Sequence, residues 1–234
     1  MHENVAGIHL LARPAARWLG LLLLAGLAPA CYSSSGKSYM APPAPGGVGT
    51  LFSDGFTTFP GTSWTKSVSP ASSADAAFTY VPPFYYLDMT DTARPGSVSA
   101  LTTMTFASQP LTFVATFQYS AASASIDTVS VQIVDNSVSP VVLAQAVVNA
   151  NTQMISFTVG GGAATTVAFQ PATFETVSFS IDASNMGSWH MGSTTTAPAA
   201  FGSHTTALRL LASYGSAATA APIFRFDTVV VSNP

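Results

Sequence analysis

From residue 51 onward, apolar and polar side chains alternate with a period of two, and no other feature constrains the fold of this chain as strongly. The alternation is clearest over residues 111–119, 128–133, 155–159 and 177–181. Successive side chains of a strand point to opposite faces, so this period predicts half-buried strands. No window of the sequence shows a convincing amphipathic helix. The pattern therefore predicts an all-β domain.

Turn-forming residues fall between these segments. They are Asp135-Asn136, residues 149–151, the triple glycine at 160–162 and residues 185–187. Gly, Asn and Asp tolerate the backbone conformations that tight turns require. About a dozen short strands separated by such turns predict a sandwich or a barrel. The triple glycine lies between two expected strands, which favours a hairpin over a phosphate-binding loop.

Charged residues are scarce, since only 7% of the chain is Asp, Glu, Lys or Arg, against about 25% in a typical domain. Ser and Thr supply the polar surface instead, a bias that we associate with extracellular β-proteins. The net charge of −3 and the lack of a basic cluster exclude nucleic acid as a partner. One cysteine cannot form an internal disulfide, and a domain of this size needs none, because it buries about 70% of its unfolded surface.

The first thirty residues have the organisation of an export signal. Arg13 and Arg17 precede an apolar run at residues 19–27, and Ala28-Pro29-Ala30 supplies small residues at the A-x-A positions. The run has about nine residues, far fewer than the roughly 20 that a membrane-spanning helix needs. We therefore expect residues 1–30 to be a signal peptide and the remainder to be exported.

Cys31, the only cysteine, follows this segment directly. Ordinary cleavage after Ala30 would leave a free thiol in an oxidising compartment. Alternatively, residues 27–31 resemble a bacterial lipobox, in which the cysteine sulfur receives a diacylglyceryl group, although Pro29 and the position of Leu27 depart from that motif. We favour a lipid anchor at Cys31, since two acyl chains suffice for stable attachment. Tyr32, in place of Asp, then predicts an outer-membrane or cell-surface location.

The rest of the chain divides into two parts. Residues 31–50 are rich in Ser, Pro and Gly, which predicts a tether. Residues 51–234 are expected to form one β-sandwich domain. Membrane contact is expected only through the N-terminal lipid anchor.

Both ends of the predicted domain resemble one family. Residues 51–64, LFSDGFTTFPGTSW, resemble the first strand of concanavalin A-like, laminin-G-type jelly rolls, and residues 222–234, PIFRFDTVVVSNP, resemble the last strand. Residues 154–169 and 175–193 resemble inner strand pairs of the same domains. The resemblance implies a two-sheet antiparallel jelly-roll sandwich whose first and last strands pair.

This family contains lectins, adhesion modules and glucanases, so the fold does not select the function. Glucanases of the family carry E-x-D-x-x-E on one strand, which supplies a nucleophile and an acid. The chain lacks that motif, and beyond the leader its single glutamate is Glu175, within FETVSF. It also lacks G-x-S-x-G and a metalloprotease motif. We therefore assign no catalytic residue.

Two clusters are candidates for carbohydrate binding, because aromatic rings stack on sugars while polar side chains bind the hydroxyl groups. One is YVPPFYYLDMTD at residues 80–91, and the other is expected at a turn near residue 190. In the alternative interpretation, these aromatic rings fill the core or coat the convex face of the sandwich. The candidate residues are Tyr80, Tyr85, Tyr86, Asp88, Trp189 and His190.

Asp54 and Asp227 are candidate calcium ligands. Calcium prefers carboxylate and carbonyl oxygens, and pairing of the first and last strands would bring these two residues near each other. The alternative interpretation is that both carboxylates accept hydrogen bonds from turn backbones.

Together these observations predict an exported, lipid-anchored cell-surface protein with a carbohydrate-binding or adhesion β-sandwich, whose partner is a glycan or polysaccharide. One alternative is a polysaccharide hydrolase or lyase of the same fold that uses an Asp pair. The other is a structural envelope lipoprotein without a small ligand.

Overall fold

The computed structural model describes residues 49–57, 61–70, 76–80, 86–91, 95–107, 110–123, 126–215 and 222–233. Within β3 and β4, residues 76, 77, 79, 80 and 91 are described by their backbone alone. All of these residues belong to one compact unit, Pro42–Pro234. The predicted signal peptide and Cys31 lie outside the described residues.

Every regular element within these ranges is a β-strand, which confirms the predicted all-β class. The first eight strands are β1 (Gly49–Asp54), β2 (Trp64–Ser69), β3 (Ala76–Tyr80), β4 (Leu87–Asp91), β5 (Gly96–Thr102), β6 (Leu111–Tyr119), β7 (Thr128–Asp135) and β8 (Val142–Asn149). The others are β9 (Met154–Val159), β10 (Thr165–Ala168), β11 (Glu175–Ile181), β12 (Met186–Met191), β13 (Thr194–Thr195), β14 (Ala199–Ala200), β15 (Thr206–Tyr214) and β16 (Phe224–Asn233). No helix in the described ranges is long and apolar enough to cross a membrane.

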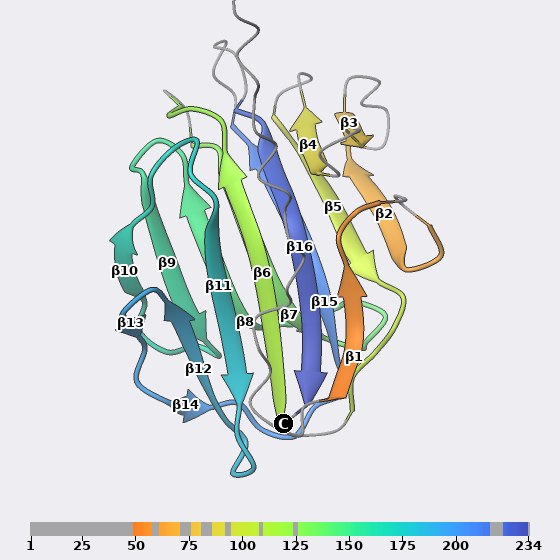
Figure 1. Ribbon diagram of the computed structural model, residues 1–234, viewed down its shortest axis with the longest axis vertical. Helices are drawn as coiled ribbons and strands as arrows, with labels where there is room; N and C mark the ends of the chain where they lie inside the picture. The colour runs from red at the N-terminus through yellow and green to blue at the C-terminus, as the bar shows by residue number, and fades with distance from the viewer. Residues whose placement is uncertain are drawn as a thin grey trace, which may run out of the picture. The chain divides into compact units, whose positions relative to one another are not determined.

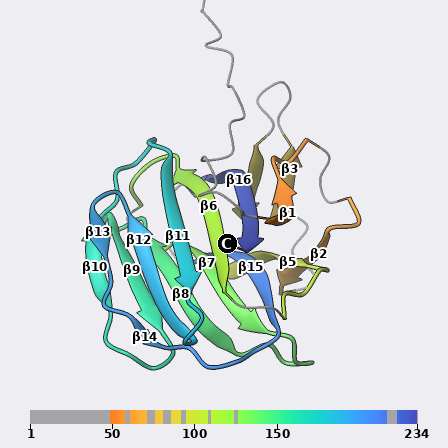
Figure 2. The ribbon, with the colours of Figure 1, turned by 60° about the horizontal axis from the view of Figure 1, so that its bottom comes forward.

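The strands form two antiparallel sheets that lie in separate layers (Figures 1 and 2). Sheet A has nine described strands: its main order is β13-β12-β11-β6-β16-β4-β3, with β1 beside β16 and β14 beside β12. Sheet B has seven, in the order β10-β9-β8-β7-β15-β5-β2. The middle of sheet B is therefore β7, with β8 and β15 on its two sides.

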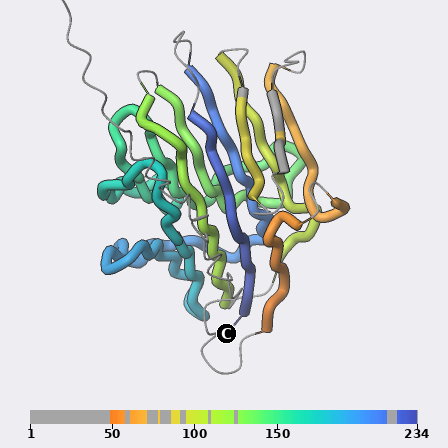
Figure 3. Tube along the Cα trace, turned by 45° about the horizontal axis from the view of Figure 1, so that its top comes forward, coloured from red at the N-terminus to blue at the C-terminus, as the bar shows by residue number. Residues whose placement is uncertain are grey.

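The first and last described strands pair, as the resemblance predicted. β1 runs antiparallel to β16, with Gly49 opposite Asn233 and Asp54 opposite Val229 (Figures 1 and 3). On the same edge of β16, β4 pairs with Phe224–Phe226, so β1 and β4 share one side of this long strand. β1 begins at Gly49, two residues before the predicted start of the domain at Leu51.

The core between the sheets is built from the buried residues of the alternating pattern. In β6 and β11 every second side chain is buried, among them Phe113, Phe117 and Phe179. Aromatic rings touch across the layers: Trp189 of sheet A lies 5.7 Å from Phe157 of sheet B, between ring centroids. Within sheet A, Trp189 also contacts Phe179, with 4.9 Å between centroids. Such pairs contribute about 0.5–1.5 kcal/mol each beyond the burial of their area.

The predicted hairpins are also present. β9 and β10 pair across the triple glycine, with Thr165 opposite Phe157, and β8 pairs with β9 across the turn at residues 149–151. Trp189 and His190, however, lie within β12 and not at a turn. The turn begins at Gly192, directly after β12 ends at Met191, and the positive φ of 56° at this position suits glycine.

Candidate functional site

The cluster predicted around residues 80–91 is partly described. Asp88 lies on β4 and forms a bidentate ion pair with Arg225 of β16, with distances of 2.6 Å and 2.7 Å. The Arg225 guanidinium also lies over the Tyr86 ring, 5.0 Å from its centroid. The Tyr86 ring in turn contacts the Phe174 ring, with 5.0 Å between the two centroids. The hydrogen bond with Asp88 raises the pKa of Arg225, although burial opposes the shift.

This arrangement gives Asp88 a structural role. Its side chain is only 7% exposed, and both oxygens already accept hydrogen bonds from Arg225. Removing one partner of such a pair would leave the other charge uncompensated. Tyr86 is half buried between Arg225 and Phe174. The Tyr80 side chain and all of Tyr85 lie outside the described residues, so their predicted role in carbohydrate binding stays a prediction.

Trp189 is buried in the core, with 1% of its surface exposed. Its indole N–H donates to the carbonyl of Thr158 at 3.0 Å, and its ring packs against Phe157 and Phe179. The ring therefore presents no face to a sugar, which corrects the prediction that Trp189 stacks on carbohydrate. The physical reason is its position on the inward face of β12, where the alternation of the strand directs it between the sheets.

His190, the next residue, points to the opposite face of β12 and is half buried. Its Nε2 lies 3.2 Å from the Ser188 hydroxyl and its Nδ1 lies 3.0 Å from the Thr195 hydroxyl. The imidazole is therefore held between two hydroxyl groups. In the described part of the chain no carboxylate bonds to this ring, so the arrangement lacks the acidic partner of a Ser-His-Asp triad.

The calcium candidates Asp54 and Asp227 lie near the same stretch of the β1–β16 pair, because Asp54 is opposite Val229. Asp54 accepts hydrogen bonds from the Phe56 amide and the Trp64 indole, each at 2.6 Å. These bonds match the alternative interpretation for Asp54, a carboxylate that holds a turn. The described residues contain no group of three or more His, Cys, Asp or Glu side chains suited to a metal ion.

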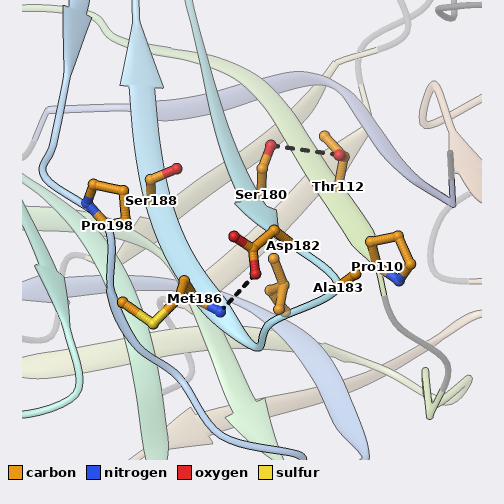
Figure 4. A pocket seen from close by; sticks show the side chains of 9 residues that line it. Pro110, Thr112, Ser180, Asp182, Ala183, Met186, Ser188 and Pro198 are labelled. Carbon is orange, nitrogen blue, oxygen red and sulfur yellow. Dashed lines mark hydrogen bonds between the residues drawn. The ribbon is translucent and has the colours of Figure 1, made fainter.

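A hollow of about 360 Å³ lies at one end of sheet A, over β11 and β12 (Figure 4). Its polar groups are engaged with one another. The Thr112 and Ser180 hydroxyls lie 3.4 Å apart, and one Asp182 oxygen accepts from the Met186 and Ser184 amides. These bonds fix the turn between β11 and β12, and they leave this hollow with few polar groups directed at a ligand.

A different arrangement occupies the middle of sheet B. Arg209 of β15 is opposite Gln132 of β7, and Gln132 is opposite Gln145 of β8. The Arg209 Nε–H donates to the Gln132 oxygen at 2.6 Å, and the Gln132 amide nitrogen donates to the Gln145 oxygen at 3.1 Å. We call these three residues the Arg209 row.

The Arg209 row lies on the outer face of sheet B. Leu208 and Leu210 flank Arg209 and are fully buried in the core, so Arg209 points the other way. Gln132 is only 5% exposed, and Ser130, two residues earlier on the same face, is 4% exposed. Burial lowers the pKa of Arg209, which nevertheless stays charged at any physiological pH. The row is thus a polar, partly desolvated strip on a face otherwise poor in charge.

Sequence reasoning did not find the Arg209 row. The alternation in residues 128–133 predicts that Ser130 and Gln132 lie in water, but in the structure both side chains are buried. Gln132 and Gln145 come from consecutive strands, 13 positions apart, but Arg209 lies 77 positions from Gln132. The meeting of all three side chains therefore depends on the register of three strands. The one available signal was an arginine in an otherwise apolar strand, LRLL.

The two layers, the strand order and the paired end strands define a jelly-roll sandwich. No protein-family model and no curated protein matches the sequence. Solved structures do match the fold. The catalytic domain of a laminarinase from Thermotoga petrophila superposes with a TM-score of 0.58 at 12% identity, covering 80% of this chain and 98% of that one.

Two further matches belong to different classes of protein. The Emp47p carbohydrate recognition domain has a TM-score of 0.58 at 14% identity and covers 78% of this chain and 95% of its own. An alginate lyase from Pseudomonas aeruginosa has a TM-score of 0.55 at 10% identity, and the match covers 74% of this chain and 99% of the lyase. At such low identity these similarities show the fold alone, which is the concanavalin A-like jelly roll that the end-strand motifs predicted.

Proposed function

We propose that this chain binds carbohydrate on the outer face of sheet B, and that the Arg209 row is the centre of the binding site. The observation that carries the proposal is the register of Arg209, Gln132 and Gln145, which places planar polar groups side by side on adjacent strands. Planar amide and guanidinium groups in fixed positions suit the hydroxyl and ring oxygens of a sugar. The matched structures, named as a glucanase, a carbohydrate recognition domain and a lyase, support carbohydrate as the ligand class.

Binding is favoured over hydrolysis by the side chains on the central strand. The outward positions of β7 are Ser130, Gln132 and Val134, and none of them can act as a nucleophilic carboxylate or a general acid. No described strand carries acidic side chains at alternating positions. The alternative of a retaining glycoside hydrolase therefore lacks, within any described strand, a pair of acidic side chains on one face.

A polysaccharide-binding assay tests this proposal. Affinity electrophoresis of the purified chain through gels that contain neutral or acidic polysaccharides, with and without calcium, should show retardation by at least one of them. Gln132→Leu should weaken that binding about tenfold or more, because it removes the amide that links the row. Thr112→Val, on the outer face of sheet A, is the matched control and should bind as the native chain does.

If no polysaccharide retards the chain, the result contradicts the proposal and favours a structural envelope protein without a small ligand. Release of reducing sugar from a bound polysaccharide would favour the enzymatic alternative. Retardation that Gln132→Leu leaves unchanged, while the variant unfolds like the native chain, would place the binding site elsewhere.

We also propose that the chain is exported and anchored at the outer membrane or cell surface by a lipid on Cys31. The apolar segment at residues 19–27, the small residues before Cys31 and the Ser-, Pro- and Gly-rich stretch after it support this proposal. Cys31→Ser should move the protein from the membrane fraction to the soluble exported fraction. Unchanged membrane association of the variant would contradict lipid anchoring without affecting the proposal on carbohydrate binding.

A further inference from the structure

We propose that the outer face of sheet B selects acidic glycans, and that the Arg209 guanidinium binds a carboxylate or sulfate group of the sugar. This inference rests on the proposed carbohydrate-binding function and specifies the chemical class of the ligand. It follows from two properties of the Arg209 row: the direction of its hydrogen bonds and, among the described residues, the absence of a compensating negative charge.

The direction of the hydrogen bonds follows from chemistry. A guanidinium donates and never accepts, so the Gln132 atom that faces Arg209 Nε must be the oxygen. The Gln132 nitrogen then faces Gln145, and the Gln145 atom that receives its hydrogen bond must also be an oxygen. The groups left over at the two ends of the row are the terminal N–H groups of Arg209 and the amide N–H groups of Gln145.

Both ends of the row therefore present donors. Within the described ranges, neither the Arg209 terminal nitrogens nor the Gln145 nitrogen has a hydrogen-bond partner. A ligand that completes this row must supply acceptors. Carboxylate and sulfate groups are the strongest acceptors that glycans carry, and they match the planar fork of an arginine.

The charge of Arg209 is also isolated. The outward positions of β5, β7, β8, β9 and β15 hold Ser, Thr, Asn, Gln and apolar side chains, with Arg209 as the one charged residue among them. Arg225, on sheet A, shows the contrast, since both oxygens of Asp88 neutralise it. Burial alone shifts the pKa of Arg209, with no contribution from a nearby carboxylate.

An uncompensated and half-buried cation favours an anionic ligand. Charge-assisted hydrogen bonds are about twice as strong as neutral ones, and partial burial of Arg209 reduces their screening by solvent. The Nε–H bond to Gln132 also holds the guanidinium in one orientation, so little side-chain freedom is lost when the ligand binds. A neutral glucan would leave the terminal N–H groups with weaker acceptors.

The experiment compares three classes of polysaccharide with the purified full chain. Affinity electrophoresis and titration calorimetry at low salt would use polygalacturonate and alginate as carboxylated glycans, chondroitin sulfate as a sulfated glycan, and laminarin as a neutral one. We expect an acidic glycan to bind about tenfold or more tightly than laminarin, and added NaCl to reduce this difference. Preference for carboxylated or for sulfated chains identifies which acidic group is bound, and either supports the proposal.

Two variants locate the selectivity. Arg209→Gln should lose about tenfold or more of the affinity for the acidic glycan and most of its salt dependence. Lys66→Gln also removes one positive charge, from an exposed position on β2, and should change neither the affinity for the acidic glycan nor its salt dependence. If Arg209→Gln fails to fold, Gln145→Leu replaces it, since Gln145 is half exposed and supplies the donor at the other end of the row.

The failures of the two proposals are distinguishable. Equal binding of laminarin and the acidic glycans, or acidic binding that survives Arg209→Gln in a folded protein, would overturn the inference on selectivity and leave the proposed carbohydrate binding intact. Binding to none of these polysaccharides would overturn both.

Discussion

At the scale of single residues, several of the described aspartates hold turns together. Asp135, at the end of β7, accepts hydrogen bonds from the Val141 amide at 2.7 Å and the Ser137 hydroxyl at 2.8 Å. Asp54 holds the Phe56 amide and the Trp64 indole in the same way. The hydrogen bond from Val141, followed by that from Ser137, lowers the pKa of Asp135. A carboxylate that is bonded only when folded links folding to pH.

The direction of the Asp135 pKa shift decides whether stability rises or falls with pH. Since the folded-state pKa of Asp135 is lowered, its contribution to stability is present above the unfolded pKa, near 4, and is lost as the pH falls through the folded value. We therefore expect Asp135→Asn to flatten the acid end of the stability curve, below about pH 4. Urea unfolding at a series of pH values measures this slope. An acid slope equal to that of the native chain would contradict the prediction.

At the scale of elements, neighbouring strands pack so closely at one glycine that no side chain fits. A Cβ on Gly187 of β12 would lie 2.5 Å from Cζ of Phe179 on β11 and 3.3 Å from a methyl carbon of Val159. The Phe179 ring cannot move aside easily, because it is fully buried and contacts Trp189 and Phe201. The small residue at position 187 is therefore required by the packing of the core.

Gly187→Ala should lower the free energy of unfolding by about 1–3 kcal/mol, the usual cost of overpacking a core. Gly161→Ala is the matched control. Its Cβ would meet nothing within 4 Å and its φ is not positive, so we expect a change within about 0.5 kcal/mol. Denaturant unfolding of both variants measures the difference. Equal stability of the two would show that Phe179 can move away from the added methyl group.

At the scale of the whole domain, the pairing of β1 with β16 brings sequence positions 49 and 233 side by side. A chain can therefore be closed there without disturbing either sheet. The β9–β10 hairpin is the place to open it, because Gly160, Gly161 and Gly162 are exposed and lie outside both strands. Exposed loop tips are where new termini are tolerated.

A circular permutant that links residue 233 to residue 49 through a short Gly-Ser linker and opens between Gly161 and Gly162 should fold. We expect its near-ultraviolet circular dichroism and its cooperative unfolding to match those of the native domain. A second permutant, opened in the middle of β6, should not fold, because it cuts a strand that pairs with both β11 and β16. Loss of cooperative unfolding in the first permutant would contradict the pairing of the end strands.

The amino-acid sequence by itself determined the layers and not the site. Period two and the turn residues were enough to predict an all-β fold, because these signals are local and depend on backbone chemistry. The jelly roll with paired ends was implied by the family resemblance of residues 51–64 and 222–234. The same signals do not show which side of the sandwich an aromatic residue faces. For Trp189, the sequence left both carbohydrate binding and packing in the core open, and only the structure places its ring in the core.

Only the tertiary structure decided which side chains from distant parts of the sequence are neighbours. Asp88 is neutralised by a residue 137 positions away, and Arg209 meets a glutamine 77 positions away. These partners depend on strand order and register, which no short window of sequence contains, since each contact is made between segments brought together by the burial of a shared core. For that reason Arg225 is paired with a carboxylate, whereas half-buried Arg209 keeps terminal N–H groups that have no acceptor among the described residues.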